Sequence, residues 1–189
     1  MKSTLIIVSG FSCTGKTALA KKIGEHFSLP AFGRDDFKES LYDSLEYSDR
    51  EWSKKLGVAS YRLLYLVVEK ILCSGSSIIL ESNFKAKPDA EKLEKLKDKY
   101  QCYLLQIHGH VEMSLALSRF ENRAKSGERH PGHVDHLIYD EMESNFKQGG
   151  YEVFDICDRT LKVDTTDFDR VNYEAIFKVV QDCLRYQNN

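Results

Sequence analysis

The sequence is poor in the residues that build disulfide-rich or zinc-stabilised domains, and it has no long uninterrupted apolar run. Among its 189 residues are five cysteines, three prolines and one tryptophan. The cysteines lie far apart and none forms a CxxC pair, which excludes a zinc ribbon or a disulfide framework and is typical of reduced thiols. The longest apolar stretch, residues 63–72, is interrupted by Glu69 and Lys70, so we expect no membrane span.

Signal-peptide features and an excess of one charge are also lacking. The first strand begins almost at once, so we expect a cytoplasmic protein without a membrane partner. The 27 lysines and arginines are balanced by 29 aspartates and glutamates, for a net charge of −2. A chain with this net charge has no strong positive electrostatic field that would attract nucleic acid. Nucleic acid therefore stays open as a partner but is not favoured. The length, without repeats or linkers, fits a single domain over residues 1–189 and leaves the oligomeric state open.

What the sequence does contain is one strong phosphate-binding pattern at residues 10–17. The segment GFSCTGKT fits GxxxxGK followed by serine or threonine, and it lies between a strand-like and a helix-like run. In this arrangement backbone N–H groups and a helix N-terminus face an anion. The lysine supplies a point charge for the β- and γ-phosphates, and the threonine offers a hydroxyl to Mg²⁺. The expected nucleotide-binding residues are Gly10, Ser12, Cys13, Thr14, Gly15, Lys16 and Thr17.

Strand-like and helix-like segments alternate along the chain. Strands are expected at residues 3–9, 29–33, 78–81, 102–107 and 159–163, and helices at 17–27, 35–41, 51–73, 87–99, 111–121, 134–147 and 170–186. Residues 43–50 and 122–133 are polar and are expected to be loops. This alternation predicts an α/β fold in three layers, with a parallel sheet covered by helices on both faces.

Carboxylates follow two of the predicted strands, at the edge of the sheet where open α/β folds bind ligands. Asp35 and Asp36 follow the second strand. One of them is enough to cap the next helix, and we favour Asp35 as the base that takes a proton from an acceptor hydroxyl. Glu81 ends the third strand and is expected, with Thr17, in the shell of Mg²⁺. The alternative for Glu81 is a solvent-facing strand end.

Three arginines surround a loop with glycine and proline, which we expect to act as a lid over about residues 122–134. A closing lid brings guanidinium groups onto the transferring phosphate and excludes water. Arg123 is the candidate for that phosphate, Arg119 for stacking on adenine, and Arg129 for the acceptor. A solvated basic loop is the alternative interpretation.

The acceptor is expected to meet residues close to Asp35 in the chain. Arg34, Lys38 and Tyr42 are the candidates, together with Arg129 of the lid. Lys38 lies three residues after Asp35, on the same face of a helix. It can contact an anionic acceptor or be an ordinary surface lysine, and the sequence favours neither.

Five segments together resemble a known family: GFSCTGKT, GRDDFKE, IILESNF, RFENRAKSGERHPGH and VDTTDF. They are similar to segments of the small P-loop kinases of the AAA_33, or zeta-toxin-like, group. The 5′-kinase domain of polynucleotide kinase, chloramphenicol phosphotransferase and gluconate kinase are related. The resemblance extends from residue 5 to about residue 170. It implies a nucleoside-monophosphate-kinase-like P-loop core with a lid, a five-stranded parallel sheet in the order 2-3-1-4-5, ATP, Mg²⁺, and phosphoryl transfer to a hydroxyl.

The resemblance also implies roles for single residues. Asp35 corresponds to the general base of polynucleotide kinase, Arg123 to the lid arginine, and Thr165 to the loop beside adenine. Two positions depart from those polynucleotide kinases, which have arginine in place of Lys38 and aspartate in place of Glu81. The first of these positions touches substrate phosphate in that family, so its change leaves the acceptor open.

Three functions follow. We favour an ATP-dependent kinase that transfers the γ-phosphoryl group to a hydroxyl of a small molecule or nucleotide, with catalytic roles for Lys16, Asp35 and Arg123. The first alternative is a 5′-hydroxyl polynucleotide kinase, against which the near-neutral charge argues mildly. The second is a nucleotide-binding switch or module without kinase activity, against which the chain has no NKxD-type or DxxG-type motif.

Overall fold

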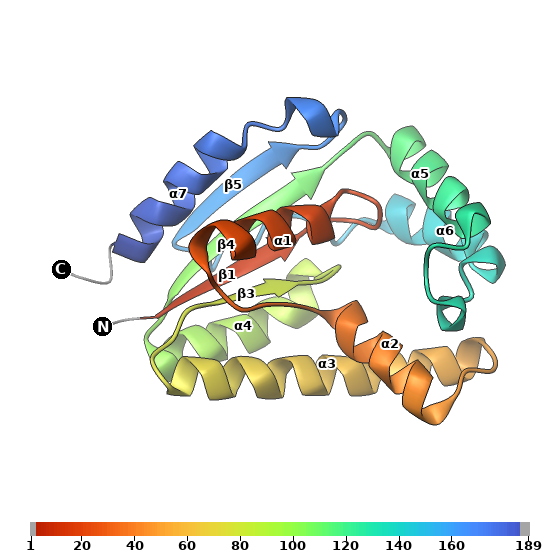
Figure 1. Ribbon diagram of the computed structural model, residues 1–189, viewed down its shortest axis with the longest axis horizontal. Helices are drawn as coiled ribbons and strands as arrows, with labels where there is room; N and C mark the ends of the chain where they lie inside the picture. The colour runs from red at the N-terminus through yellow and green to blue at the C-terminus, as the bar shows by residue number, and fades with distance from the viewer. Residues whose placement is uncertain (1–2, 186–189) are drawn as a thin grey trace.

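The computed structural model describes residues 3–185, and one parallel β-sheet lies at its centre (Figure 1). The strands are β1 Thr4–Ser9, β2 Ala31–Gly33, β3 Ile78–Glu81, β4 Tyr103–His110 and β5 Arg159–Asp164. They pair in parallel in the order β2–β3–β1–β4–β5. This confirms the α/β class and the strand order, in which the strand leading into the phosphate loop is central.

The burial of each strand follows its place in the sheet. Every residue of β1 (TLIIVS) and of β3 (IILE) is buried, because central parallel strands are covered on both faces and need near-continuous apolar runs. The edge strand β5 (RTLKVD) buries only Val163 fully. Charged residues on an edge strand also discourage pairing with another chain.

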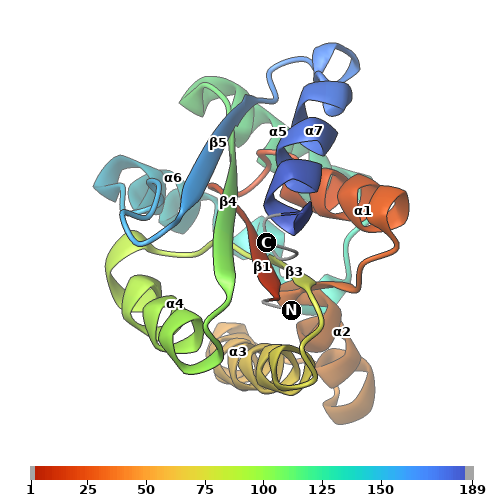
Figure 2. The same cartoon turned by 90° about the vertical axis from the view of Figure 1, so that its left-hand side faces the viewer.

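Helices cover both faces of the sheet (Figure 2). They are α1 Lys16–Phe27 and α7 Tyr173–Arg185 on one face, and α3 Arg50–Cys73 and α4 Ala86–Tyr100 on the other. Successive side chains of β1 point to opposite faces. Ile6 and Val8 therefore pack with α1 and α7, whereas Leu5 and Ile7 pack with α3 and α4. The three-layer arrangement is confirmed.

The remaining helices gather at the carboxyl ends of the strands (Figure 1). They are α2 Arg34–Leu45, α5 Met113–Ser126, α6 Tyr139–Gln148 and the 3₁₀ turns η1 Pro131–His133, η2 Asp135–Leu137 and η3 Phe168–Arg170. The register aligns Val8, Gly33 and Glu81 on neighbouring strands, so the phosphate loop, α2 and the end of β3 meet at one edge. No helix within residues 3–185 is long and apolar enough to cross a membrane.

The lid differs from its predicted form. Helix α5 continues to Ser126, beyond its predicted end, so Arg123 lies on a helix and not in a loop. The helix stops because Gly127 has a φ of 70°, the left-handed conformation common just after helices. Val134 also has a left-handed φ, 49°. The helix predicted from that residue therefore becomes a 3₁₀ turn, followed by α6.

Helix α2 is longer than predicted. It ends at Leu45, so the loop before α3 spans residues 46–49 and not 43–50. The start of α3 is set by Asp49, whose Oδ1 accepts from the backbone N of Trp52 at 2.8 Å.

Candidate active site

The phosphate loop joins β1 to α1 and depends on two glycines. Gly10 has a φ of 135°, and a Cβ there would lie 2.2 Å from the carbonyl oxygen of Gly109. Gly15 has a φ of 71°, and a Cβ there would lie 2.3 Å from the ring of Phe168. Neither position accommodates a side chain. Glycine adopts these conformations without strain, and in them the backbone N–H groups of the loop can turn toward an anion.

Lys16 lies inside this loop. Its Nζ donates to the carbonyl oxygen of Phe11 at 2.6 Å, and Thr14 Oγ1 donates to the same oxygen at 2.9 Å. Burial lowers the pKa of the Lys16 ammonium group, while nearby Glu81 acts in the opposite direction. No carboxylate among the described residues forms an ion pair with Lys16. A desolvated ammonium group of this kind suits a phosphate partner.

Thr17 and Glu81 place two hard oxygen donors beside the loop. Thr17 Oγ1 donates to Glu81 Oε2 at 3.1 Å. Burial raises the pKa of the Glu81 carboxyl, and Lys16 opposes this effect. Mg²⁺ prefers oxygen ligands and keeps several waters, so one hydroxyl and one carboxylate fit it. The described side chains contain no cluster of three or more histidine, cysteine or acidic residues.

Asn83 ties the phosphate loop to the end of β3. Its Nδ2 donates to Ser12 Oγ at 2.8 Å. Sequence reasoning did not single out Asn83, although its position two residues after Glu81 at a strand end was an available signal.

The structure gives Asp35 and Asp36 different roles. Asp36 Oδ2 accepts from the backbone N of Gly33 at 2.7 Å and so closes the first turn of α2. Asp35 lies between two guanidinium groups, since Oδ1 accepts from Arg34 Nη2 at 2.9 Å and Oδ2 accepts from Arg129 Nη2. Burial by itself raises the pKa of Asp35, but Arg34 and Arg129 outweigh it and hold that pKa well below its usual range. Asp35 is therefore an ionised hydrogen-bond acceptor.

Arg123 and Arg129 share one carboxylate, that of Asp135. Arg123 Nη2 donates to Asp135 Oδ2 at 3.2 Å, and Arg129 Nη1 donates to the two oxygens at 2.9 and 3.1 Å. Arg123 Nε is buried and has no hydrogen-bond partner among the described residues. A buried guanidinium donor without a partner fits a phosphate oxygen. Sequence reasoning missed Asp135, because no local pattern links a turn carboxylate to arginines on other elements.

Arg119 fastens the segment after β5 to the phosphate loop. Its Nη2 donates to the carbonyl oxygens of Thr165 and Thr166, each at 2.9 Å. Thr165 is fully buried, and its hydroxyl lies 3.1 Å from the carbonyl oxygen of Thr14. The sequence predicts stacking of Arg119 on adenine, whereas here its guanidinium lies 4.4 Å from the ring centroid of Phe168. Phe168, which sequence reasoning missed, offers an exposed aromatic ring beside the loop.

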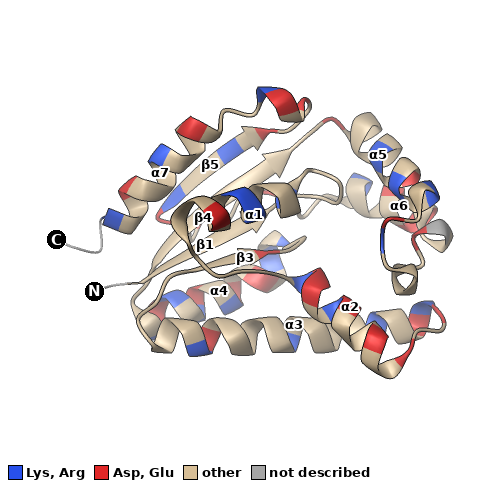
Figure 3. Ribbon diagram, viewed as in Figure 1, with Lys and Arg blue, Asp and Glu red and all other residues tan. Residues whose placement is uncertain are grey.

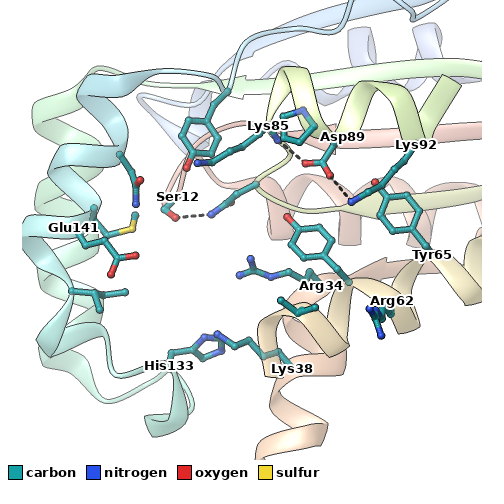
Figure 4. Close-up of a pocket in the computed structure, with 18 of the residues that line it drawn as sticks. Ser12, Arg34, Lys38, Arg62, Tyr65, Lys85, Asp89, Lys92, His133 and Glu141 are labelled. Carbon is teal, nitrogen blue, oxygen red and sulfur yellow. Dashed lines mark hydrogen bonds and ion pairs between the residues drawn. The ribbon is translucent and has the colours of Figure 1, made fainter. Parts of the chain in front are cut away.

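Two cavities meet at this site. The loop cavity, about 680 Å³, is lined by the phosphate loop, the arginines of α5 and Asp35. The helix cavity, about 930 Å³, is lined by residues of α2, α3 and α4 and, opposite them, of α6 (Figure 4). Ser12, Asn83 and Arg129 line both cavities. The ion pair between Arg129 and Asp35 therefore lies where the two cavities adjoin.

Lys38 and Tyr42 have different positions relative to the helix cavity. Lys38 lines it and donates from Nζ to Ser53 Oγ at 3.1 Å. Burial and the neighbouring Arg34 lower the pKa of Lys38 to about 8. Tyr42 lines neither cavity, because it is buried under Gly132 of the lid, with its hydroxyl 2.7 Å from Ser53 Oγ. Tyr42 thus supports the lid, whereas Lys38 is buried and lines the helix cavity. Of the two interpretations that the sequence left open, the ordinary surface lysine does not fit this position, and contact with an acceptor stays a prediction.

Positive charge exceeds negative charge around the helix cavity. Nine lysine and arginine side chains line it, against four carboxylates. The side-chain cations of Lys38, Arg62 and Lys85 form no ion pair with a carboxylate among the described residues, and Figure 4 shows these residues around the cavity. Along the outer helices the two signs are interspersed (Figure 3). A chain with a net charge of −2 therefore concentrates positive charge here, which favours an anionic ligand.

Comparison with solved structures supports a kinase-like P-loop fold. A candidate kinase from Chloroflexus aurantiacus is 32% identical, with a TM-score of 0.86 over 97% of this chain and 100% of that chain. Kti12 of Chaetomium thermophilum, solved with ADP–AlF3, is 16% identical, with a TM-score of 0.68 over 95% of this chain and 98% of its own. At that identity the second comparison supports the fold alone.

Comparison with known sequences also finds a kinase. A shikimate kinase of Dictyoglomus turgidum is 24% identical over an alignment of 200 positions, which covers 96% of this chain and 100% of that protein. The resemblance to the zeta-toxin-like group is confirmed by a family model that matches residues 1–177. The chain belongs to the Zeta toxin family.

Proposed function

We propose that this protein is an ATP-dependent kinase that transfers the γ-phosphoryl group to a hydroxyl of an anionic small molecule or nucleotide. The position of Asp35 carries the proposal. Its carboxylate lines the loop cavity, while its two ion-pair partners, Arg34 and Arg129, line the helix cavity. A carboxylate between a phosphate-binding loop and a second cavity suits transfer between two substrates. The kinases among the similar proteins point the same way.

The loop cavity takes the nucleotide. Backbone N–H groups of residues 12–17 and Lys16 bind its phosphates. Thr17 and Glu81 hold Mg²⁺, which when bound supplies charge that neutralises the phosphate oxygens. Phe168 offers a ring to a nucleobase, and Arg119 supports that ring from its other side.

Asp35 accepts a hydrogen bond from the acceptor hydroxyl and orients its oxygen toward the γ-phosphorus. The acceptor oxygen then forms a bond to phosphorus, the bond from phosphorus to the bridging oxygen of ADP breaks, and the hydroxyl proton passes to Asp35 and on to water. The low pKa of Asp35 makes it a weak base, so orientation is its main contribution. This suits the loose transition state of phosphoryl transfer, in which little proton transfer is needed.

Arg123 stabilises the transferring group. Its buried Nε has no protein partner within residues 3–185, and the residue lines the loop cavity. Guanidinium donors that meet charge developing on the equatorial oxygens lower the barrier to transfer.

The helix cavity takes the acceptor, and its excess of cations favours an anionic one. A second candidate acceptor is the 5′-hydroxyl end of an oligonucleotide. It is favoured by the tyrosines Tyr61, Tyr65 and Tyr151, which line the same cavity among the cations, because bases stack on aromatic rings.

A transfer assay with radiolabelled ATP tests the proposal. The acceptor panel contains sugar acids, sugar phosphates, nucleotides, neutral polyols and a 5′-hydroxyl oligonucleotide. We expect labelling of an anionic acceptor. We expect Asp35→Asn to lower transfer about a hundredfold or more while ATP binding, measured by calorimetry, stays near that of the wild type.

Asp36→Asn is the matched control, because Asp36 caps α2 and does not line the loop cavity. It should lower stability and leave transfer largely intact. Full transfer by Asp35→Asn would rule out its proposed role. ATP binding with no labelled acceptor across the panel would favour a nucleotide-binding module.

A further inference from the structure

Asp135 is a buried carboxylate that the proposed mechanism does not use. It lies in turn η2, and its side chain is 7% exposed. Its three side-chain hydrogen bonds all come from Arg123 and Arg129. Burial of a carboxylate is unfavourable unless cations pair with it. The two arginines thus account for its position.

Asp135 also decides how the two arginines lie relative to each other. Two guanidinium groups repel, and a carboxylate between them removes that repulsion. Arg129 uses its other terminal nitrogen to pair with Asp35. The four side chains therefore form a continuous chain of ion pairs, Asp35–Arg129–Asp135–Arg123, from the proposed base to the proposed phosphate-binding arginine.

Arg123 has no other polar partner that could set its orientation. Its single hydrogen bond within the described residues goes to Asp135, and otherwise its guanidinium packs over the ring of Phe120 at 5.4 Å. The partnerless Nε is thereby kept at the loop cavity.

The backbone holds Asp135 in place. Its carbonyl oxygen accepts from the backbone N of Ile138 at 3.3 Å, and that of Val134 accepts from the N of Leu137 at 2.9 Å. On the other side, His133 Nε2 lies 2.8 Å from Glu39 Oε1 of α2. A carboxylate on such an anchored turn can pre-organise the groups bound to it.

We propose that Asp135 is a positioning residue that holds Arg123 and Arg129 in the orientation required when the γ-phosphoryl group is transferred. This inference rests on the proposed kinase function. It predicts that Asp135 acts on the transition state and hardly on the bound nucleotide, because ground-state binding relies on the phosphate loop.

The test compares the affinity for MgADP with that for MgADP in the presence of aluminium fluoride, which mimics the transferring phosphoryl group. It needs no acceptor. We expect the wild type to bind the fluoride complex more tightly. Asp135→Asn should change MgADP affinity by less than about threefold and lower the preference for the fluoride complex about tenfold or more.

Two further variants separate positioning from folding. Asp135→Glu keeps the charge and should recover part of the preference, and it replaces Asp135→Asn if that variant does not fold. Glu121→Gln is the matched control. It removes the exposed partner of Lys125 on α5, the helix that carries Arg123, and leaves both arginines paired, so the preference should stay as in the wild type.

The outcomes are distinguishable. A wild-type preference that persists in Asp135→Asn overturns the positioning role alone. Equal losses of affinity for MgADP and for the fluoride complex also overturn it, since they indicate a structural role. A wild type that shows no preference overturns the kinase proposal, and the inference with it.

Discussion

The docking of the lid on α2 can be tested at one glycine. A Cβ at Gly132 would lie 2.6 Å from Cγ and Cδ2 of Tyr42 and 2.8 Å from its Cδ1, whereas ordinary contacts begin at 3.4 Å. The ring has little room to withdraw, because Tyr42 is 1% exposed and its hydroxyl lies 2.7 Å from Ser53 Oγ. We therefore predict that Gly132→Ala separates the turn Pro131–His133 from α2.

The contacts that hold the turn set the size of the effect. His133 Nε2 lies 2.8 Å from Glu39 Oε1, and His130 Nε2 lies 3.1 Å from Asp43 Oδ1. The ring of His130 also stacks on Tyr42, with centroids 5.1 Å apart. The two hydrogen bonds and this stacked pair stabilise the docked turn by about 3 kcal/mol, and edge contacts of His133 with Tyr42 and of His130 with Tyr47 add to it. Overpacking by a methyl group costs about 1–3 kcal/mol, so alanine removes much of the docking free energy.

Hydrogen exchange measures the outcome. A loss of about 2 kcal/mol lowers the ratio of docked to undocked turn about thirtyfold. The amides of His133, Val134 and Leu137, which donate within the turns, should exchange faster by that factor. Amides of β1 should exchange as in the wild type. Phosphoryl transfer should fall as well, since Arg129 and Asp135 move with the turn.

Gly127→Ala is the matched control in the same lid. Gly127 also has a positive φ, 70°, but no atom lies within 4 Å of its Cβ position. The substitution adds left-handed strain of about 1 kcal/mol without a clash and should leave exchange in the turns unchanged. Wild-type exchange and transfer in Gly132→Ala would refute the reasoning.

Three further predictions concern the metal, the phosphate loop and pH. Glu81→Gln should raise the Mg²⁺ concentration for half-maximal transfer about tenfold or more, and an unchanged Mg²⁺ titration would exclude Glu81 from the metal shell. Gly10→Ala should abolish ATP binding measured by calorimetry, because the alanine Cβ would lie 2.2 Å from Gly109 O. Wild-type affinity for ATP in this variant would show that the loop backbone can shift to accommodate the methyl group. Burial and Arg129 lower the pKa of His133 to about 3, so below pH 6.5 the unfolded chain binds a proton that the folded protein does not. The free energy of unfolding, from urea titrations, should therefore fall by up to about 1.4 kcal/mol per pH unit from this group as pH drops from 6.5 to 5. His133→Asn should flatten that slope, and an equal slope in both proteins would contradict the assignment.

The sheet was predictable because its signals are local. Apolar runs such as residues 5–8 and 78–80 mark buried strands wherever they occur, and all of them are fully buried in the structure. The strand order came from the family resemblance, since alternation alone does not decide which strands are neighbours.

The sequence favours Asp35 over Asp36 as the base, because one of the two is enough to cap the helix. In the structure Asp36 accepts from Gly33 N, and Asp35 meets Arg129, a residue 94 positions away. The first contact is a local capping pattern. The second depends on how the lid returns to α2, which no short-range pattern encodes.

The sequence by itself determined the phosphate loop. Residues 4–17 form a strand, a loop and a helix start from contiguous residues, so glycine conformations and backbone N–H groups specify an anion site locally. Only the tertiary structure decided which carboxylates the lid arginines meet and why a glycine is needed at position 132, where the lid packs on Tyr42. Asp35 and Tyr42 lie on α2 and Asp135 lies in η2, and their contacts with the lid arise when α5, the 3₁₀ turns and α2 converge at the carboxyl ends of the strands.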